Sequence, residues 1–320
     1  LSFNLVCVSN ATIFKPLGFY IRGFSSLQQN DYYFIFMLVL YICTLLANIL
    51  IMSIIWFTES LHTPKYIAVF SLAVVDISYS TALIPKSVDI FIFNSRFVFY
   101  DPCLTQMFFV HYFSAMESFA LSVLAYDRLI AICFPLRSNT LNTNRRMILI
   151  VTISWTVPFI VVLSMVSLIS RLSFCRSTTV FSAEHGFVYV LACMDTSFNR
   201  KLGNWLKTLV ALLFPLFFIL STYMIILFIV LKIASTEQRQ KAFQTCLSHL
   251  LCAFVYYIPI ILTYILANLR LITSLDVLTS LLITSVILPP MLNPVIYWFN
   301  TEELKVKLLH FFKRNKTFPR

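Results

Sequence analysis

Long apolar runs separated by short polar stretches make up most of the chain. Seven of these runs carry either no charge or a single acidic residue, and each reaches the length of about 20 residues that an α-helix needs to cross a bilayer core. Because lipid offers no partner for backbone N–H and C=O groups, each run is expected to be helical. The predicted spans cover residues 32–58, 66–85, 104–126, 147–170, 208–231, 242–269 and 277–301.

This pattern predicts an all-α membrane protein. A seven-transmembrane helix bundle over residues 32–301 follows an N-terminal segment, residues 1–31, and precedes a short tail, residues 302–320. In the tail, apolar residues recur at helical spacing beside lysines, which predicts a short amphipathic helix in the membrane interface. The apolar members are Leu304, Leu308, Phe311 and Phe312, and the basic members are Lys305, Lys307 and Lys313.

The distribution of basic residues predicts the orientation of the bundle. Lysine and arginine recur in the loops after the first, third and fifth spans and in the tail, as in Arg137, Arg145 and Lys232. Cytoplasmic loops carry such an excess, so these loops are expected inside and the N-terminus outside. Asn10 then begins an Asn-Ala-Thr glycosylation sequon on the extracellular side.

The composition agrees with a lipid environment and excludes several other classes. Hydrophobic residues make up 59% and charged residues only 12% of the 320 positions, whereas soluble domains carry roughly a quarter charged residues. The net charge of +11 is assigned to membrane topology and not to nucleic-acid binding. No cysteine pair has zinc-site spacing, and no nucleophile–base pair suggests an enzyme.

Two acidic residues, Asp76 and Glu117, interrupt the second and third apolar spans. A charge inside a membrane helix costs about 2.5–3.5 kcal/mol on insertion scales, so both are candidate functional residues. If their helices are neighbours, the carboxyl groups could share a cavity with a monovalent cation such as sodium. The alternative is a pair of protonated acids, each hydrogen-bonded within the bundle.

The stretch AYDRLIAICFPLR, residues 125–137, places Asp127 beside Arg128 at the predicted cytoplasmic end of the third span. One interpretation is an interfacial ion pair that anchors the helix end. The other is a switch, in which Asp127 holds the permanently charged Arg128 in one state and releases it to a partner in another.

Prolines supply a second feature of such a switch, because each removes a helical hydrogen bond. They interrupt spans four to seven at Pro158, Pro215, Pro259 and the run PPMLNP. Asn293, which directly precedes Pro294, is expected to satisfy the backbone that this proline frees.

Several motifs together resemble the odorant receptor family of rhodopsin-like G-protein-coupled receptors. Their sequences are most similar to the fish-type branch. The resemblance covers residues 18–312. The motifs are LHTPKY (61–66), SLAVVD (71–76), AYDRLIAICFPLR (125–137), KAFQTCLSHL (241–250) and LNPVIY (292–297).

The resemblance implies roles for particular residues. Asp76 and Glu117 match an acidic pair thought to hold sodium, and Arg128 matches the arginine that enters the G protein. The other implied positions are Asn293, Pro294 and Tyr297 as a seventh-helix switch, Tyr223 in the Arg128 network, Tyr257 at the pocket floor, Trp155 in the fourth helix and Cys103 as a disulfide-forming cysteine.

Two departures from the family pattern bear on these roles. Leu129 replaces the usual tyrosine after the arginine. The second outer loop carries two cysteines where the family often has three, so Cys103 is expected to pair with Cys193, with Cys175 as the alternative partner.

A ligand pocket is expected to open outward between spans three, five, six and seven. Small-molecule pockets are mostly apolar with a few placed polar groups. The candidates are His111, Ser114, Lys207, Tyr257 and Tyr264. As a hypothesis, His111 and Lys207 favour a polar or anionic odorant; in the alternative, His111 is a satisfied interior histidine and Lys207 reaches to the headgroups.

The sequence therefore predicts an odorant receptor that binds small molecules and activates a stimulatory, olfactory-type heterotrimeric G protein. It is expected in the plasma membrane of sensory neuron cilia, in contact with membrane lipid, with no cofactor and with a sodium ion as an allosteric ligand. The alternatives are a non-olfactory chemoreceptor of the same fold and an ion-coupled transporter. The odd number of spans and the four glycines argue against the transporter.

Overall fold

The computed structural model describes residues 16–21, 30–93, 95–174, 179–180, 192, 202–203, 205–233, 235–269, 271, 274–300 and 303–307. Seven helical segments in this part of the chain are long and apolar enough to cross a membrane, which confirms the predicted fold class. They are α1 (Asn30–Phe57), α2 (Pro64–Phe91), α3 (Tyr100–Cys133), α5 (Asn144–Ser170), the π-helical η2 (Lys207–Leu213) continued by α8 (Phe214–Leu231), α9 (Thr236–Asn268) and α10 (Leu275–Asn300).

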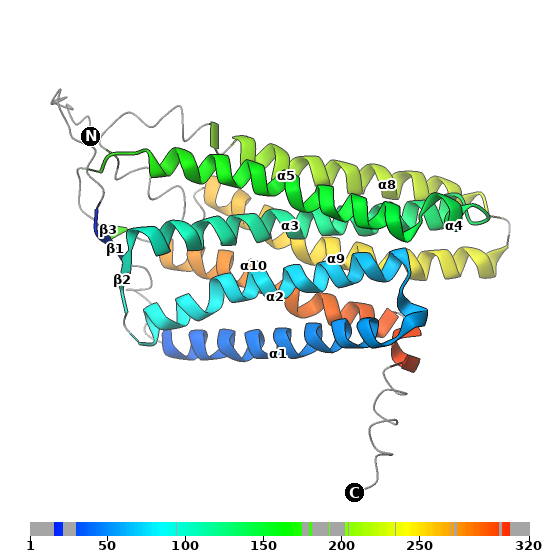
Figure 1. Ribbon diagram of the computed structural model, residues 1–320, viewed down its shortest axis with the longest axis horizontal. Coiled ribbons are helices and arrows are strands. Elements are labelled where there is room, and N and C mark those ends of the chain that lie inside the picture. The colour runs from blue at the N-terminus through cyan, green and yellow to red at the C-terminus, as the bar shows by residue number, and fades with distance from the viewer. Residues whose placement is uncertain are drawn as a thin grey trace, which may run out of the picture.

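The long helices run side by side along one axis (Figure 1). Helix α3 lies at the centre, where it packs against α2, α5, α8 and α9, while α1 packs against α2 and α10. A small sheet lies at one end of the bundle, here the sheet end. The short helices η1 (Glu59–Leu61) and α4 (Ser138–Leu141) lie at the other, here the α4 end.

Apolar side chains cover the outside of the bundle. Ile35 on α1, Phe217 on α8 and Ile160 on α5 are 49%, 73% and 60% exposed. In water such a surface would be costly, but in a bilayer it faces hydrocarbon. Polar and charged side chains of α2, α3 and α10, among them Asp76 and Glu117, are instead buried.

The sheet end carries three strands that no period-two pattern in the sequence had indicated. Strand β1 (Gly18–Ile21) pairs antiparallel with β2 (Phe97–Phe99) and parallel with β3 (Thr179–Val180). Gly18 is required at this crossing, because a Cβ there would lie 2.3 Å from the carbonyl oxygen of Val98. Phe19 is fully buried and packs against the rings of Tyr100 and Phe174.

The helices continue through their prolines. Pro85 lies inside α2, Pro158 inside α5 and Pro259 inside α9. The π-helical turns of η2 end at Leu213, two residues before Pro215. The hydrophobic pattern cannot show this irregularity, because the apolar run continues unbroken through it.

The expected role of Asn293 at Pro294 is wrong. A proline frees the carbonyl of the residue four positions earlier, here Pro290, and the amide of Asn48 on α1 donates to that oxygen at 3.1 Å. Asn293 points instead toward Asp76 on α2 and donates to both carboxylate oxygens. The freed backbone is therefore satisfied by a neighbouring helix and not locally.

Candidate functional site

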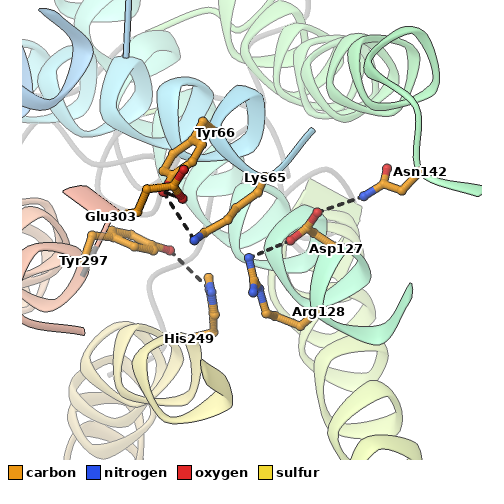
Figure 2. Close-up of polar contacts among 8 residues, drawn as sticks. All are labelled: Lys65, Tyr66, Asp127, Arg128, Asn142, His249, Tyr297 and Glu303. Atoms are coloured by element: carbon orange, nitrogen blue, oxygen red, sulfur yellow. Dashed lines mark hydrogen bonds and ion pairs between the residues drawn. The ribbon is translucent and has the colours of Figure 1, made fainter. Parts of the chain in front are cut away.

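The Asp127–Arg128 pair lies in the last turns of α3 at the α4 end, and both side chains are buried. Nη2 of Arg128 lies 2.8 Å from Oδ2 of Asp127, and Nδ2 of Asn142 donates to Oδ1 of Asp127 at 2.8 Å (Figure 2). Both carboxylate oxygens are thus engaged. The structure brings the predicted pair together and adds Asn142, just after α4, as a third member.

Arg128 is held only in part by this contact. Its Nε is buried and has no hydrogen-bond partner among the described residues. Figure 2 shows Lys65 of α2 pointing toward the same space between the helices. A buried pair of this kind is weak evidence for stability, whereas removal of one partner leaves an uncompensated charge. Removal of Asp127 would therefore leave the buried guanidinium without its charged partner.

A second contact joins the start of α2 to the short helical segment 303–307 beyond α10. The hydroxyl of Tyr66 donates to Oε2 of Glu303 at 2.6 Å, and Nζ of Lys65 donates to the same hydroxyl at 3.5 Å. Leu304 is buried in the apolar core beside Ile54 of α1. Residues 303–307 agree with the predicted helix after the seventh span, and the rest of that helix lies outside the described residues.

We expect Tyr66→Phe to lower the midpoint of thermal unfolding of the purified chain. The change keeps the buried ring and removes a hydrogen bond to a charged group, which contributes about 1.5–3 kcal/mol. Glu303→Gln should give a smaller loss, because an amide oxygen still accepts. The double variant should be no less stable than Tyr66→Phe alone; fully additive losses would show that the two side chains do not interact.

Tyr297 on α10 and His249 on α9 meet at the same end of the bundle. The hydroxyl of Tyr297 lies 3.4 Å from Nδ1 of His249, and both side chains are buried. The sequence had indicated Tyr297 but not His249, whose partner is 48 positions away. Tyr223 of α8 packs beside Cys246 and Ile226, but its buried hydroxyl has no hydrogen-bond partner among the described residues.

Asp76 and Glu117 are both buried near the middle of the bundle, with 1% and 0% exposure. Nδ2 of Asn293 lies 3.1 Å and 3.3 Å from the two oxygens of Asp76. Both oxygens of Glu117 and Oδ1 of Asn293 are buried without a hydrogen-bond partner among the described residues. Unpartnered carboxylate and amide oxygens are the ligands that hard cations prefer. The residues present therefore fit a hard cation such as sodium.

A cavity of about 190 Å³ lies between α2, α3, η2, α9 and α10, here the interhelical cavity. His111 and Ser114 line it as predicted. The hydroxyl of Ser114 makes no hydrogen bond to a described residue, while its carbonyl accepts one from Tyr256 at 2.9 Å. The other polar residues in the lining are Tyr79, Thr208 and Ser285.

Tyr256, and not its neighbour Tyr257, is among the residues that line this cavity, and the role of Tyr257 at the pocket floor stays a prediction. Adjacent residues on a helix point about 100° apart. Tyr257 turns toward α3, where its hydroxyl lies 2.6 Å from Oγ of Ser118. The two tyrosines thus tie α9 to two successive turns of α3.

Several predictions concern parts of the chain outside the described residues. They are the glycosylation site at Asn10, the cysteines Cys175 and Cys193, and the side chains of Lys207 and Tyr264. Cys103 is a buried free cysteine in the structure. Phe174 and Ala192, which adjoin the two predicted partners, pair with each other and pack in the same apolar cluster as Cys103. The disulfide stays a prediction.

The bundle, with polar groups buried along its length, defines a multi-pass membrane protein with the seven-helix fold of G-protein-coupled receptors. The sequence model described as "Olfactory receptor" matches residues 36–315. Together with its curated relatives, this match shows that the chain belongs to the olfactory receptor family. The family is one of receptors and not of enzymes.

Curated relatives match over nearly the full chain. Mouse olfactory receptor 51E2 is 33% identical over 307 residues, which cover 94% of each chain. Human olfactory receptor 10H1 is 36% identical over 313 residues, covering 97% of this chain and 96% of the relative. Human olfactory receptor 1J1 is 34% identical over 309 residues, covering 96% and 94%. Assignment to the fish-type branch stays a prediction.

Proposed function

We propose that the chain is an odorant receptor that binds a small odorant in the interhelical cavity and activates a stimulatory, olfactory-type heterotrimeric G protein at the α4 end. The observation that carries this proposal is the course of α3. The helix lines the cavity through His111 and Ser114 and holds Arg128 near its other end. A ligand bound at the cavity part of α3 can therefore shift the conformational equilibrium of the Arg128 part of the same helix.

The contacts of α9 supply a route for this coupling. Tyr256 and Tyr257 hold α9 to Ser114 and Ser118 on α3, and His249 of α9 meets Tyr297 of α10 closer to the α4 end. An odorant that favours a different position of Tyr256 would weaken this attachment. The population then shifts toward a state with α9 moved outward and Arg128 released, in proportion to the ligand's differential affinity for that state.

Exposed apolar residues at the α4 end support a docking partner there. Leu136 is 99% exposed and Phe134 49% exposed in the turn between α3 and α4. Arg137 and Arg145 lie nearby and are also exposed. This end is assigned to the cytoplasm by its basic residues. The N-terminus is then extracellular, and the proposed location is the plasma membrane of sensory neuron cilia.

Asp76, Glu117 and Asn293 would hold a sodium ion in the resting receptor. When bound, the ion supplies the positive charge that two buried carboxylates otherwise lack. The chain itself supplies the bridge between α2 and α10, through the two contacts from Asn293 to Asp76.

The proposal is tested by measuring cyclic AMP in cells that express the chain with the olfactory-type stimulatory G protein. Mixed odorants are applied, and surface expression is measured in the same cells. A response that is absent from cells lacking the receptor is expected. Silence toward a broad odorant panel, with the receptor at the surface, would contradict the proposed function.

Once an agonist with an oxygen function is in hand, we expect Ser114→Ala to lower its potency about tenfold. The variant removes a hydroxyl at the cavity wall, and a lost hydrogen bond costs about 0.5–1.5 kcal/mol. The measurement is the agonist concentration for half-maximal cyclic AMP. Ser164→Ala is a matched control, because Ser164 lies on α5, outside the cavity lining, and its hydroxyl donates to the carbonyl of Val161 on the same helix. Equal shifts in both variants would remove Ser114 from the site.

A further inference from the structure

A second, larger cavity of about 850 Å³ lies between α2 and α3 in the half of the bundle near the sheet end. It shares no lining residue with the interhelical cavity. Thr81, Thr105 and Phe109 in its lining are exposed, although they belong to membrane-spanning segments. The cavity therefore opens sideways, onto the surface that lipid covers, and is here named the lateral groove.

Polarity changes regularly along the lateral groove. Helices α2 and α3 run in opposite directions, so Lys86 and Asp101 meet at the sheet end while Ile77 and Phe113 meet at the deep end. Asp101 and Phe113 lie twelve positions apart on α3, which is about 18 Å at 1.5 Å per residue. Half of a hydrocarbon core of about 30 Å is of similar length. The groove thus runs through one leaflet, charged at the interface and apolar toward the midplane.

The charges at the groove mouth have both signs. Lys86 is about one-third exposed and pairs with Asp89 one turn further along α2, while Asp101 is exposed at the start of α3. A cation and an anion at one mouth complement a headgroup that itself carries a phosphate and an ammonium. An anionic headgroup would meet Asp101 unfavourably, and a sterol hydroxyl would offer Asp101 no cationic partner, whereas Lys86 already has Asp89.

The middle of the groove is polar but uncharged. The amide of Gln106 on α3 reaches the carbonyl of Ala82 on α2 at 3.4 Å, and Thr105 lies beside it on α3. Thr81 lines the opposite side, with its hydroxyl donated to the carbonyl of Ile77. Groups of this kind suit the ester region of a glycerolipid, which lies between the headgroup and the acyl chains. Below them, Phe109 and Phe113 offer apolar surface.

We propose that the lateral groove binds one zwitterionic glycerophospholipid from the leaflet on the sheet side. Its phosphate lies at Lys86, its ammonium at Asp101 and one acyl chain along Ile77, Phe109 and Phe113. The lipid fills the space between α2 and α3 from outside the bundle. It is a component of the folded receptor distinct from any odorant.

The test uses the purified full chain in detergent and a fluorescent phosphatidylcholine as the probe. Unlabelled phosphatidylcholine should displace the probe saturably, and phosphatidylglycerol of the same acyl chains should compete at least about threefold more weakly, as expected for a partly exposed charge. Equal competition by phosphatidylglycerol, or equally strong displacement by cholesterol, would overturn the proposal. This comparison needs no variant and so does not depend on any variant's folding.

Variants then locate the binding site. Asp101→Asn and Lys86→Gln should each weaken phosphatidylcholine binding by about threefold, and the double variant by about tenfold if the effects add. Asp89→Asn is the matched control, because it breaks the Lys86–Asp89 ion pair but keeps Lys86 and Asp101 charged, and it should bind phosphatidylcholine at least as tightly as the unaltered chain. Unchanged binding by the double variant would overturn the assignment to this groove.

Discussion

Arg128→Ala is expected to abolish odorant-stimulated cyclic AMP while the receptor still reaches the cell surface. The guanidinium is buried, bonded to Asp127 and otherwise only partly engaged. In the proposed active state it is the charge that α3 offers to the G protein. Truncating one partner of a desolvated charge contact costs about 2–5 kcal/mol, so coupling should fall by about thirtyfold or more. The measurement is the maximal cyclic AMP response, normalised to surface expression.

Arg146→Ala is a suitable control for this experiment. Arg146 lies at the same end of the bundle and carries the same charge, but it is exposed and its guanidinium donates to the backbone carbonyls of Thr140 and Leu141. Its loss should leave signalling nearly unchanged. A surface-expressed Arg128→Ala receptor that responds like the parent would show that the Asp127–Arg128 pair only anchors the end of α3.

Asp127→Asn separates the two interpretations further. It removes the negative charge that holds Arg128 and keeps an oxygen able to accept from Asn142. A switch predicts raised signalling without odorant, because the resting state loses a contact that the active state lacks. An anchor predicts reduced stability and no rise in basal signalling.

The overall fold follows from the sequence because its cause is local. A run of apolar residues long enough to cross the bilayer must be helical wherever it lies, since only a helix satisfies its own backbone there. The three strands at the sheet end have no such local cause. Strand β1 forms because Gly18 allows close approach to Val98 and because Phe19 finds a buried place beside Tyr100, contacts that span about 80 positions.

The functional sites were predictable to the extent that a rare residue type marked them. Asp76 and Glu117 stand out as acids in apolar helices, and the structure buries both. Asn48 was not identified, because an asparagine near a helix middle does not reveal that it bonds to the carbonyl of Pro290, 242 positions away. Tyr256 was missed for a similar reason.

The helical period alone cannot tell which of two adjacent tyrosines faces the cavity. That choice depends on the rotation of α9 about its own axis, which is set by its packing against α3. In the structure, hydrogen bonds to Ser114 and Ser118 hold Tyr256 at the cavity and Tyr257 against α3. Likewise, His249 acquires a role only because α10 places Tyr297 beside it.

Glu117→Gln is expected to remove the response of the purified receptor to sodium. If sodium binds the folded chain alone, the stabilisation grows with concentration and reaches about 2.7 kcal/mol at one hundred times the dissociation constant. The midpoint of thermal unfolding of the unaltered chain should therefore rise as sodium chloride replaces N-methylglucamine chloride at constant ionic strength. The variant keeps the side-chain shape but removes the charge that attracts the ion, so its midpoint should not rise.

The order of stability of the unaltered chain and Glu117→Gln should also reverse between sodium-free and high-sodium buffer. Without sodium, the unaltered chain buries two acidic groups whose mutual repulsion is not compensated, and Glu117→Gln relieves it, so the variant should be at least as stable. In high sodium the unaltered chain should be the more stable. Glu237→Gln, on the exposed first turn of α9, should leave the sodium response intact. A parallel rise with sodium in the unaltered chain and in Glu117→Gln would place the effect elsewhere and leave Asp76 and Glu117 as neutral acids.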